Sequence, residues 1–241
     1  MKNKPKYKRV LLKISGEALM GSNSFGIDSN VVTRIANEII YVTKQNIEVC
    51  LVIGGGNIFR GVSVSASGMD RTTGDYMGML GTVMNSLAIQ NSLEENGKAV
   101  RVMSALPISA VCEPYIRRKA IRHLEKNRIV IFAAGTGNPY FTTDTAAALR
   151  ASEIKCDILL KATKVDGIYD SDPEKNKNAK KLYNLSYDYV INKDLRIMDT
   201  SSISLAKENK IPILVFSIQE YNSLKDIVNG KGNFTLIQWW Q

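Results

Sequence analysis

Short apolar runs alternate along this chain with longer segments in which apolar residues recur at helical spacing. The short runs predict strands at residues 10–14, 49–53, 100–104, 129–133, 158–160, 213–216 and 234–238. The longer segments predict helices at residues 30–44, 72–95, 115–127, 145–152, 198–209 and 221–228. Strands that alternate with helices indicate an α/β fold with a mostly parallel sheet covered on both faces. Ligands of such sheets bind beyond the carboxyl ends of the strands, so we expect the chemistry in the loops that follow them.

Composition narrows the class of protein. Of 241 residues, 44% are hydrophobic and 23% are charged, as in ordinary globular proteins. No stretch approaches the roughly 18 apolar residues of a membrane helix, and the basic N-terminus lacks the apolar segment of a secretory signal. Three cysteines, Cys50, Cys112 and Cys156, show no metal-ligand spacing, and their odd number argues against a disulfide framework. We therefore expect a cytoplasmic protein that makes no use of a membrane.

The formal net charge of +9 raises the question of nucleic-acid binding. The basic residues are scattered along the chain rather than clustered, and no helix-turn-helix or zinc-finger pattern accompanies them. The charge is therefore better explained by a solvated surface and by phosphate-bearing substrates than by dedicated binding of nucleic acid.

Two loops near the N-terminus have compositions that suit phosphate groups. Lys13, Ser15 and Gly16 end the first predicted strand and offer an ammonium group together with backbone N–H donors. The glycines at 54–56 follow the second strand and leave room for a ligand to approach the backbone, and Arg60 behind them suits bidentate phosphate binding. Neither loop matches the Walker A or the dinucleotide-binding pattern. Each of them alone is also compatible with a tight turn that binds nothing.

The strongest local signal follows the fourth predicted strand, where two glycines, Asn-Pro and three threonines, Thr136, Thr142 and Thr143, precede an alanine-rich helix. Thr143 as the N-cap would point the positive end of that helix at an anion, with Asp144 in the first turn. Asp75 opens the long predicted helix. Its residue type favours a helix cap, although a ribose hydroxyl is an alternative partner.

A further loop, after the fifth strand, combines cations with an aromatic ring. Lys161 and Lys164 follow a buried strand, and Tyr169 is placed to stack on a planar base. Asp166-Gly167 and Asp172-Pro173 are turn signals. A hairpin with solvent-facing lysines is the competing interpretation.

Taken together, these loops resemble those of the bacterial UMP kinase family, within the amino acid kinase superfamily. The resemblance covers about residues 7–237, and its most specific parts are the segments 74–85 and 135–144. It implies a three-layer αβα sandwich around a mostly parallel twisted sheet. It also implies a single domain over residues 1–241, of which 1–6 form a flexible tail, and a homohexamer. The implied reaction is transfer of the ATP γ-phosphoryl group to UMP.

The resemblance also assigns residues to sites. It implies an ATP site that consists of Lys13, Ile14, Ser15, Gly16, Gly56, Arg60, Thr163, Tyr169 and Asp172. It implies a UMP site that consists of Gly55, Asp75, Thr136, Gly137, Asn138, Pro139, Tyr140, Phe141, Thr142 and Thr143, in which Asp75 binds the ribose. The implied catalytic group comprises Lys13, Lys161, Asp144, Arg60 and Asp199. Mg²⁺ is expected to enter with ATP, held by phosphate oxygens rather than by a dedicated protein site.

The resemblance also bears on regulation. Relatives are commonly activated by GTP and inhibited by UTP, and their activation segment matches Gly21, Ser22, Asn23, Ser24, Phe25 and Gly26. Gln90 and Glu94 stand where some relatives carry basic residues, which leaves GTP activation open. The terminal pair Trp239-Trp240 is atypical. Two other functions remain as alternatives: a carboxylate or carbamate kinase of the same superfamily, and a nucleic-acid-binding regulator.

Overall fold

The computed structural model describes residues 6–59, 68–171, 175–195 and 197–239. Arg60, Asp172, Trp240 and residues 1–5 of the predicted tail lie outside the described residues.

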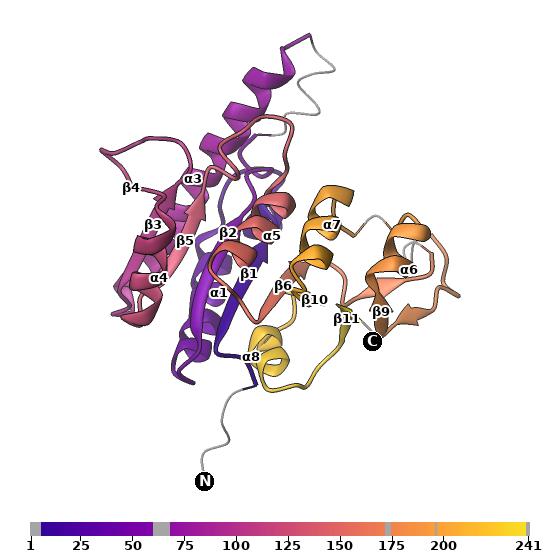
Figure 1. Ribbon diagram of the computed structural model, residues 1–241. Coiled ribbons are helices and arrows are strands. Elements are labelled where there is room, and N and C mark those ends of the chain that lie inside the picture. The colour runs from indigo at the N-terminus through magenta and orange to yellow at the C-terminus, as the bar shows by residue number, and fades with distance from the viewer. Residues whose placement is uncertain (1–5, 60–67, 172–174, 196, 240–241) are drawn as a thin grey trace.

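The secondary structure follows the predicted alternation (Figure 1). The strands are β1 (Arg9–Ile14), β2 (Glu48–Ile53), β3 (Val100–Ser104), β4 (Glu113–Pro114), β5 (Ile129–Ala133), β6 (Ile158–Thr163), β7 (Ile168–Tyr169), β8 (Lys181–Leu182), β9 (Asn184–Ser186), β10 (Ile213–Ser217) and β11 (Phe234–Gln238). The helices are the 3₁₀ turn η1 (Gly16–Leu19), α1 (Ser29–Thr43), α3 (Arg71–Glu95), α4 (Arg117–Glu125), α5 (Thr143–Glu153), α6 (Tyr187–Asn192), α7 (Thr200–Glu208) and α8 (Ser223–Val228). Every predicted strand and helix is confirmed, with ends displaced by three residues at most.

Nine strands form one sheet in the order β4-β3-β5-β2-β1-β6-β10-β11-β9. Neighbouring strands run parallel except β10 and β11, so the prediction of a mostly parallel sheet is confirmed. β1 lies at the centre between β2 and β6. The loops that follow β1, β2, β5 and β6 therefore meet at one edge of the sheet.

Each central strand is buried on both faces because its alternate residues face different layers of helices. Leu12 and Leu51 pack with helices α1, α3 and α8 in one core. Leu11 and Leu159 pack with helices α4, α5, α6 and α7 in a second core on the other face. Figure 1 shows the helices on either side of the sheet. This arrangement is the expected three-layer αβα sandwich.

Two predicted helix caps are wrong by a few residues. Asp70, not Asp75, caps α3, because the helix begins at Arg71 and the Asp70 side chain accepts from the Thr73 N–H at 3.0 Å. Thr142, not Thr143, caps α5 by accepting from the N–H groups of Asp144 and Thr145. Asp75 and Thr143 therefore lie within their helices, and their side chains are available for other partners.

The elements that the sequence pattern missed are short. The strands β4, β7, β8 and β9 have two or three residues each, and α6 has six. Such lengths hold less than two periods of an apolar repeat, so no periodic signal marks them. β7 and β8 form a separate antiparallel ribbon after β6, which sets the position of Tyr169.

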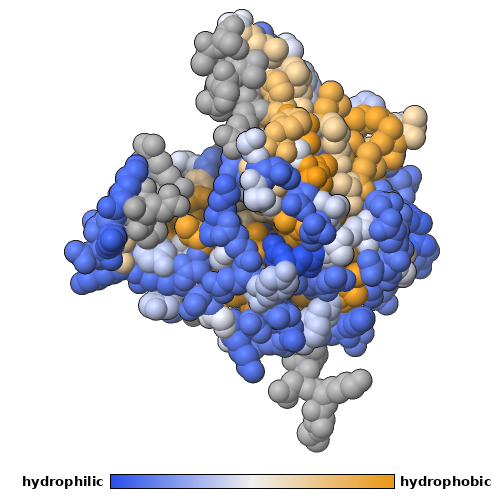
Figure 2. All heavy atoms as spheres, turned by 180° about the vertical axis from the view of Figure 1, so that it is seen from behind, coloured by the Kyte–Doolittle hydropathy of each residue, from blue (hydrophilic) through white to orange (hydrophobic). Residues whose placement is uncertain are grey.

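Helix α3 carries an exposed apolar stripe that does not pack in either core. Tyr76, Met77, Leu80 and Met84 lie at helical spacing on α3, with 37–52% of each residue exposed. Figure 2 shows hydrophobic residues gathered on the upper part of the molecule, where α3 lies in Figure 1, above a mostly hydrophilic lower part. Exposed apolar stripes of this kind are typical of interaction surfaces.

Candidate active site

Two lysines lie side by side at the centre of the sheet. β1 and β6 pair in parallel with Lys13 opposite Lys161, and each lysine is only 8% exposed. Side chains that are opposite each other on paired strands point to the same face, so the two ammonium groups are brought together. Their mutual repulsion requires a compensating negative charge nearby.

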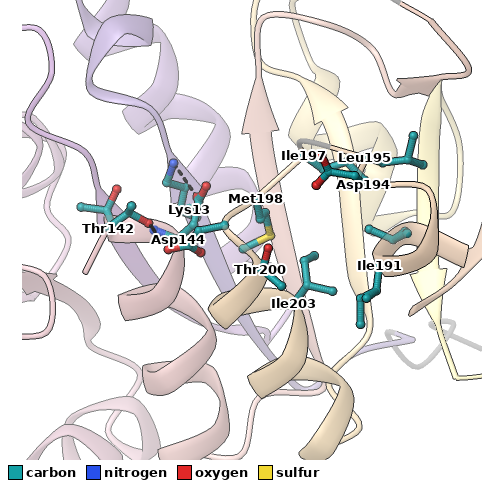
Figure 3. A pocket seen from close by; sticks show the side chains of 13 residues that line it. Lys13, Thr142, Asp144, Ile191, Asp194, Leu195, Ile197, Met198, Thr200 and Ile203 are labelled. Carbon is teal, nitrogen blue, oxygen red and sulfur yellow. Dashed lines mark hydrogen bonds and ion pairs between the residues drawn. The ribbon is translucent and has the colours of Figure 1, made fainter. Parts of the chain in front are cut away.

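Asp144 supplies that charge from the first turn of α5. Its Oδ2 lies 2.7 Å from Lys161 Nζ, and its Oδ1 lies 2.7 Å from Lys13 Nζ. Figure 3 shows the Asp144 carboxylate facing the Lys13 ammonium group. One carboxylate thus bridges two cations that come from separate strands, which gives the group a net charge of +1.

Burial alone would raise the pKa of Asp144, but the positive charges of Lys13 and Lys161 outweigh it and hold the pKa below its ordinary value. Burial lowers the pKa of Lys161, and the nearby Lys13 charge adds to this, although Asp144 opposes both. The carboxylate is therefore ionised at neutral pH. An ammonium group that is desolvated in this way is suited to bind an incoming phosphate.

Asp199 acts on this group from a distance. Its Oδ2 accepts from Thr145 Oγ1 at 2.5 Å and from Thr142 Oγ1 at 2.8 Å, so it holds the first turn of α5. It is the N-cap residue of α7, but its side chain makes no cap hydrogen bond to that helix. Its negative charge raises the pKa of Lys161. Asp199 therefore belongs to the charge network as a residue that positions Asp144.

A cavity of about 700 Å³ opens on one side of the lysines, at the ends of β1 and β6. It brings together five of the residues predicted for the ATP and catalytic sites: Lys13, Ser15, Lys161, Thr163 and Tyr169. The Tyr169 hydroxyl donates to Asp166 Oδ1 at 2.7 Å, and this hydrogen bond raises the pKa of Tyr169 to about 12. The ring is thereby held at the cavity wall as a neutral planar group, which suits stacking on a base.

A second cavity, of about 520 Å³, opens beside α3. It brings together seven of the residues predicted for the UMP site: Gly55, Asp75, Thr136, Tyr140, Phe141, Thr142 and Thr143. Gly56 also lines it, and Glu17 lines both this cavity and the one beside Tyr169. The two cavities therefore adjoin at the loop that follows β1.

The glycines after β2 serve packing as well as ligand access. A Cβ at Gly55 would lie 2.4 Å from the Gly78 carbonyl oxygen of α3, so a larger residue cannot fit without displacing that helix. A Cβ at Gly56 would meet nothing closer than 4.0 Å, which leaves that position open toward the cavity. Only the second of the two glycines thus leaves open space for a ligand.

Asp75 ties α3 to the loop after β5. Its Oδ2 accepts from the Tyr140 N–H at 2.7 Å and lies 3.7 Å from Arg71 Nε. The Arg71 guanidinium also lies 4.9 Å from the centre of the Tyr140 ring. Arg71 lines the cavity but was missed in the sequence, where its position four residues before Asp75 on one helix was the available signal.

Some predicted residues lie apart from the cavity walls. The Ile14 side chain is fully buried in the core, so only its backbone can serve a ligand. Gly137, Asn138 and Pro139 form the tip of the loop and line neither of these two cavities. Residues 21–26 form an exposed turn that contacts the chain after the glycine loop through Gly26. The cavity residues that sequence reasoning missed include Glu17, Phe59, Arg71, Gly74, Gly78, Met79, Thr82, Asp194, Leu195 and Ile197.

A third cavity, of about 640 Å³, lies between α5, α6 and α7 (Figure 3). Thr142, Asp144 and Lys13 form its polar end, and Ile191 and Ile203 lie at its apolar end. It therefore reaches the charged group from the side of the helices, away from the glycine loop.

Comparisons with known proteins agree with this geometry. Residues 8–217 match the model of the amino acid kinase family. The chain belongs to this family. It is 57% identical over 235 residues to the uridylate kinase of Rickettsia prowazekii (strain Madrid E), which covers 98% of this chain and 97% of the relative. A uridylate kinase of Cereibacter sphaeroides (strain ATCC 17023) is 58% identical over 232 residues, with 96% and 94% covered.

Two solved structures within the family have the same fold. The UMP kinase of Bacillus anthracis superposes with a TM-score of 0.93 at 42% identity, and 96% of each chain is covered. The UMP kinase of Ureaplasma parvum superposes with a TM-score of 0.92 at 36% identity, covering 97% of this chain and 99% of the other. The predicted family resemblance and fold are confirmed.

Removal of Asp144 would leave two buried ammonium groups facing each other. We expect Asp144→Ala to lower the free energy of unfolding at pH 7 by about 3–5 kcal/mol, the usual cost of breaking a buried ion pair. Denaturant titration measures this change. Asp188→Ala is the matched control, because the Asp188–Lys207 pair is largely exposed and its loss should cost less than about 1 kcal/mol.

The pH dependence of this difference follows from the lowered pKa of Asp144. A carboxylate whose pKa falls on folding stabilises the protein above its unfolded value, here about 3.8, and loses that contribution as the pH drops through the folded pKa. The gap between wild type and Asp144→Ala should therefore be constant near neutrality and shrink below pH 3.8. A gap that stays unchanged in acid would contradict the assigned ion pairs.

Proposed function

We propose that this protein is a UMP kinase, which transfers the γ-phosphoryl group of ATP to UMP and yields UDP and ADP in pyrimidine nucleotide synthesis. The observation that carries the proposal is the buried lysine pair, Lys13 and Lys161, beside two adjoining cavities. One cavity is lined by a tyrosine that suits a base, and the other by glycines and threonines that suit a nucleoside phosphate. The near full-length similarity to uridylate kinases supports the same acceptor.

The chemical difficulty of this reaction is repulsion between two polyanions. The phosphate of UMP is already a nucleophile at neutral pH, so transfer can proceed directly and in line without a strong base. Lys13 and Lys161 would neutralise the transferred group, while Asp144 keeps their ammonium groups in place. Catalysis would then come from positioning and from fixed positive charge.

Each cavity has a specific role in this proposal. The ATP side would use Ser15 and the backbone of Ile14 and Gly16 for phosphate, and Thr163 and Tyr169 for adenosine. The UMP side would use the loop from Thr136 to Thr143 around the nucleotide, with Asp75 at the ribose. Arg60 and Asp172 stay predictions, since both lie outside the described residues.

Mg²⁺ would enter this site as a complex with ATP. The donor set supports this, because both oxygens of the central carboxylate, Asp144, are directed at ammonium groups and suit the orientation of lysines better than a metal cage. The ion would supply charge neutralisation of the phosphate chain. Lys13 and Ser15 would hold that chain from the protein side.

A panel of phosphoryl acceptors tests the proposed function. Coupled measurement of ADP release with UMP, CMP, a glutamate derivative and carbamate should give the highest kcat/KM with UMP, because the second cavity offers groups for a ribose and a phosphate. Preference for the glutamate derivative or for carbamate would favour the alternative kinase class. No ATP turnover with any acceptor, together with tight binding of duplex DNA at physiological salt, would favour a nucleic-acid-binding regulator.

The lysine pair is tested by substitution. Lys13→Ala and Lys161→Ala should each lower kcat by roughly 10²–10³-fold, as expected when one preorganised transition-state donor is lost. Steady-state assays at saturating ATP and UMP measure this effect, and thermal melts establish that the variants are folded. Lys207→Ala, on the exposed end of α7, is the control and should keep wild-type kcat. A kcat within about threefold of wild type in both pocket variants would refute these roles.

We further propose that copies of this chain assemble, with a homohexamer as the expected form. The support is the exposed stripe of Tyr76, Met77, Leu80 and Met84 on α3, which is apolar and lies on the helix that bounds the UMP cavity. Burial of such a stripe between two copies would remove its apolar surface from water.

Light scattering coupled to size exclusion tests the assembly. Leu80→Asp should shift the protein to a smaller species, because the new carboxylate would be buried without a partner. Val165→Asp, at an exposed position away from α3, is the control and should leave the mass unchanged. A monomeric wild type would overturn the proposal.

Residues 21–26 are our proposed regulatory segment, with UTP as an inhibitor. We also propose GTP as an activator. On α3, Gln90 donates to Glu94 at 3.1 Å, so these two positions offer no cation to the GTP phosphates. We propose a cytoplasmic location, which rests on the cysteine usage. No helix in the described part of the chain is long and apolar enough to cross a membrane.

A further inference from the structure

Two asparagines form a closed hydrogen-bonded pair beneath the nucleotide loops. Asn57, after the glycine loop, is 1% exposed, and Asn85, on α3, is fully buried. Asn57 Nδ2 donates to Asn85 Oδ1 at 2.9 Å, and Asn85 Nδ2 donates to Asn57 Oδ1 at 2.6 Å. Two buried side-chain amides can each donate to and accept from the other only in one relative orientation. The pair therefore fixes α3 against the chain after β2.

The remaining donor of each amide reaches a different loop. Asn57 Nδ2 also donates to the Gly26 carbonyl at 2.8 Å, and the Gly26 N–H donates back to the Asn57 carbonyl at 2.9 Å. Asn85 Nδ2 also donates to the Gly54 carbonyl at 2.7 Å. The pair therefore joins three segments: residues 21–26, the glycine loop, and α3.

The same pair supports the loop after β1. A Cβ at Gly16 would lie 2.5 Å from both Asn57 Oδ1 and the Gly54 carbonyl oxygen, so the backbone of Gly16 is packed directly against them. The Gly54 N–H in turn donates to the Ile14 carbonyl at 2.9 Å. A shift of the asparagine pair would thus displace both the loop assigned to ATP phosphate and the loop assigned to UMP.

α3 reaches the third nucleotide loop from the same face. Thr82 lies three residues before Asn85, and its Oγ1 accepts from the Ala134 N–H at 2.7 Å where the loop after β5 begins. One buried polar face of α3 therefore holds both loops that line the UMP cavity, while the exposed stripe lies elsewhere on the helix.

We propose that Asn57 and Asn85 are positioning residues that couple residues 21–26 to both nucleotide sites. A displacement of Gly26 would shift Asn57, and through Asn85 it would shift Gly54. A change in the exposed turn would therefore change the position of the loops at which the two phosphates meet. Neither asparagine touches a substrate in this scheme. The inference rests on the proposed kinase function, because its effect is measured on that reaction.

Asn85→Asp tests the coupling while it preserves the shape of the side chain. The carboxylate still accepts from Asn57 Nδ2, but it cannot donate to the Gly54 carbonyl or to Asn57 Oδ1, so the glycine loop loses its anchor and the pair loses one of its two hydrogen bonds. We expect KM for ATP and KM for UMP to rise together by about five- to tenfold, the size of effect seen when a coupling residue is altered. Amide hydrogen exchange of a peptide that contains Gly26 should also become faster.

Ser86→Ala is the matched control on the same helix. Ser86 is fully buried, and its hydroxyl donates to the Thr82 carbonyl within α3 rather than to a loop. This variant removes a buried polar group without touching either loop, so it should keep both KM values within about twofold. If Ser86→Ala and Asn85→Asp raise KM equally, the pair is only part of the core and the proposal is wrong.

A measurement on the wild-type enzyme covers the case in which Asn85→Asp does not fold. Addition of UMP alone should slow exchange at Gly26, since coupling between two sites is reciprocal. Unchanged exchange at Gly26 with saturating UMP would overturn the proposal without any variant. If the wild-type protein does not phosphorylate UMP, the proposed function itself is wrong. If the wild type is active and Asn85→Asp keeps both KM values, only the coupling is wrong.

Discussion

The structure depends on a carboxylate placed between two buried ammonium groups. Parallel pairing of β1 and β6 sets Lys13 beside Lys161, and the low exposure of both makes their repulsion costly. Asp144 removes most of that cost because it contacts both lysines at 2.7 Å. Lys13, Lys161 and Asp144 together carry one excess positive charge at the carboxyl ends of β1 and β6, which suits an incoming phosphate group.

This charged group determines where α5 must begin. Thr142 caps the helix, and Asp199 holds both Thr142 and Thr145, so the first turn is tied down from two sides. A small displacement of this turn would move the Asp144 oxygens away from one lysine or the other. The caps and ties of this turn therefore set the position of the Asp144 carboxylate between the two lysines.

Helix α3 combines several functions on different faces. Its buried polar side contacts the glycine loop and the loop after β5 through Asn85 and Thr82. Its close contact with Gly55 shows why the chain after β2 is rich in glycine. Its exposed stripe offers an apolar surface to another molecule. The exposed apolar stripe and the contacts to both loops thus lie on one helix.

Much of the fold and site was predictable from the sequence, because apolar runs and helical repeats are local patterns. The strand order, the caps Asp70 and Thr142, and the cavity residue Arg71 were not, since each depends on backbone ends or on partners remote in the chain.

The sequence by itself determined the alternation of strands and helices, the loops that hold the candidate residues, and the family to which they belong. The tertiary structure alone decided that Lys13, Asp144 and Lys161 form one charged group, and that Asn57 pairs with Asn85 across 28 positions of chain. The physical reason is that hydrophobic periodicity is a property of neighbours in sequence, whereas charge compensation and the pairing of buried amides exist only once the sheet register brings distant residues into contact.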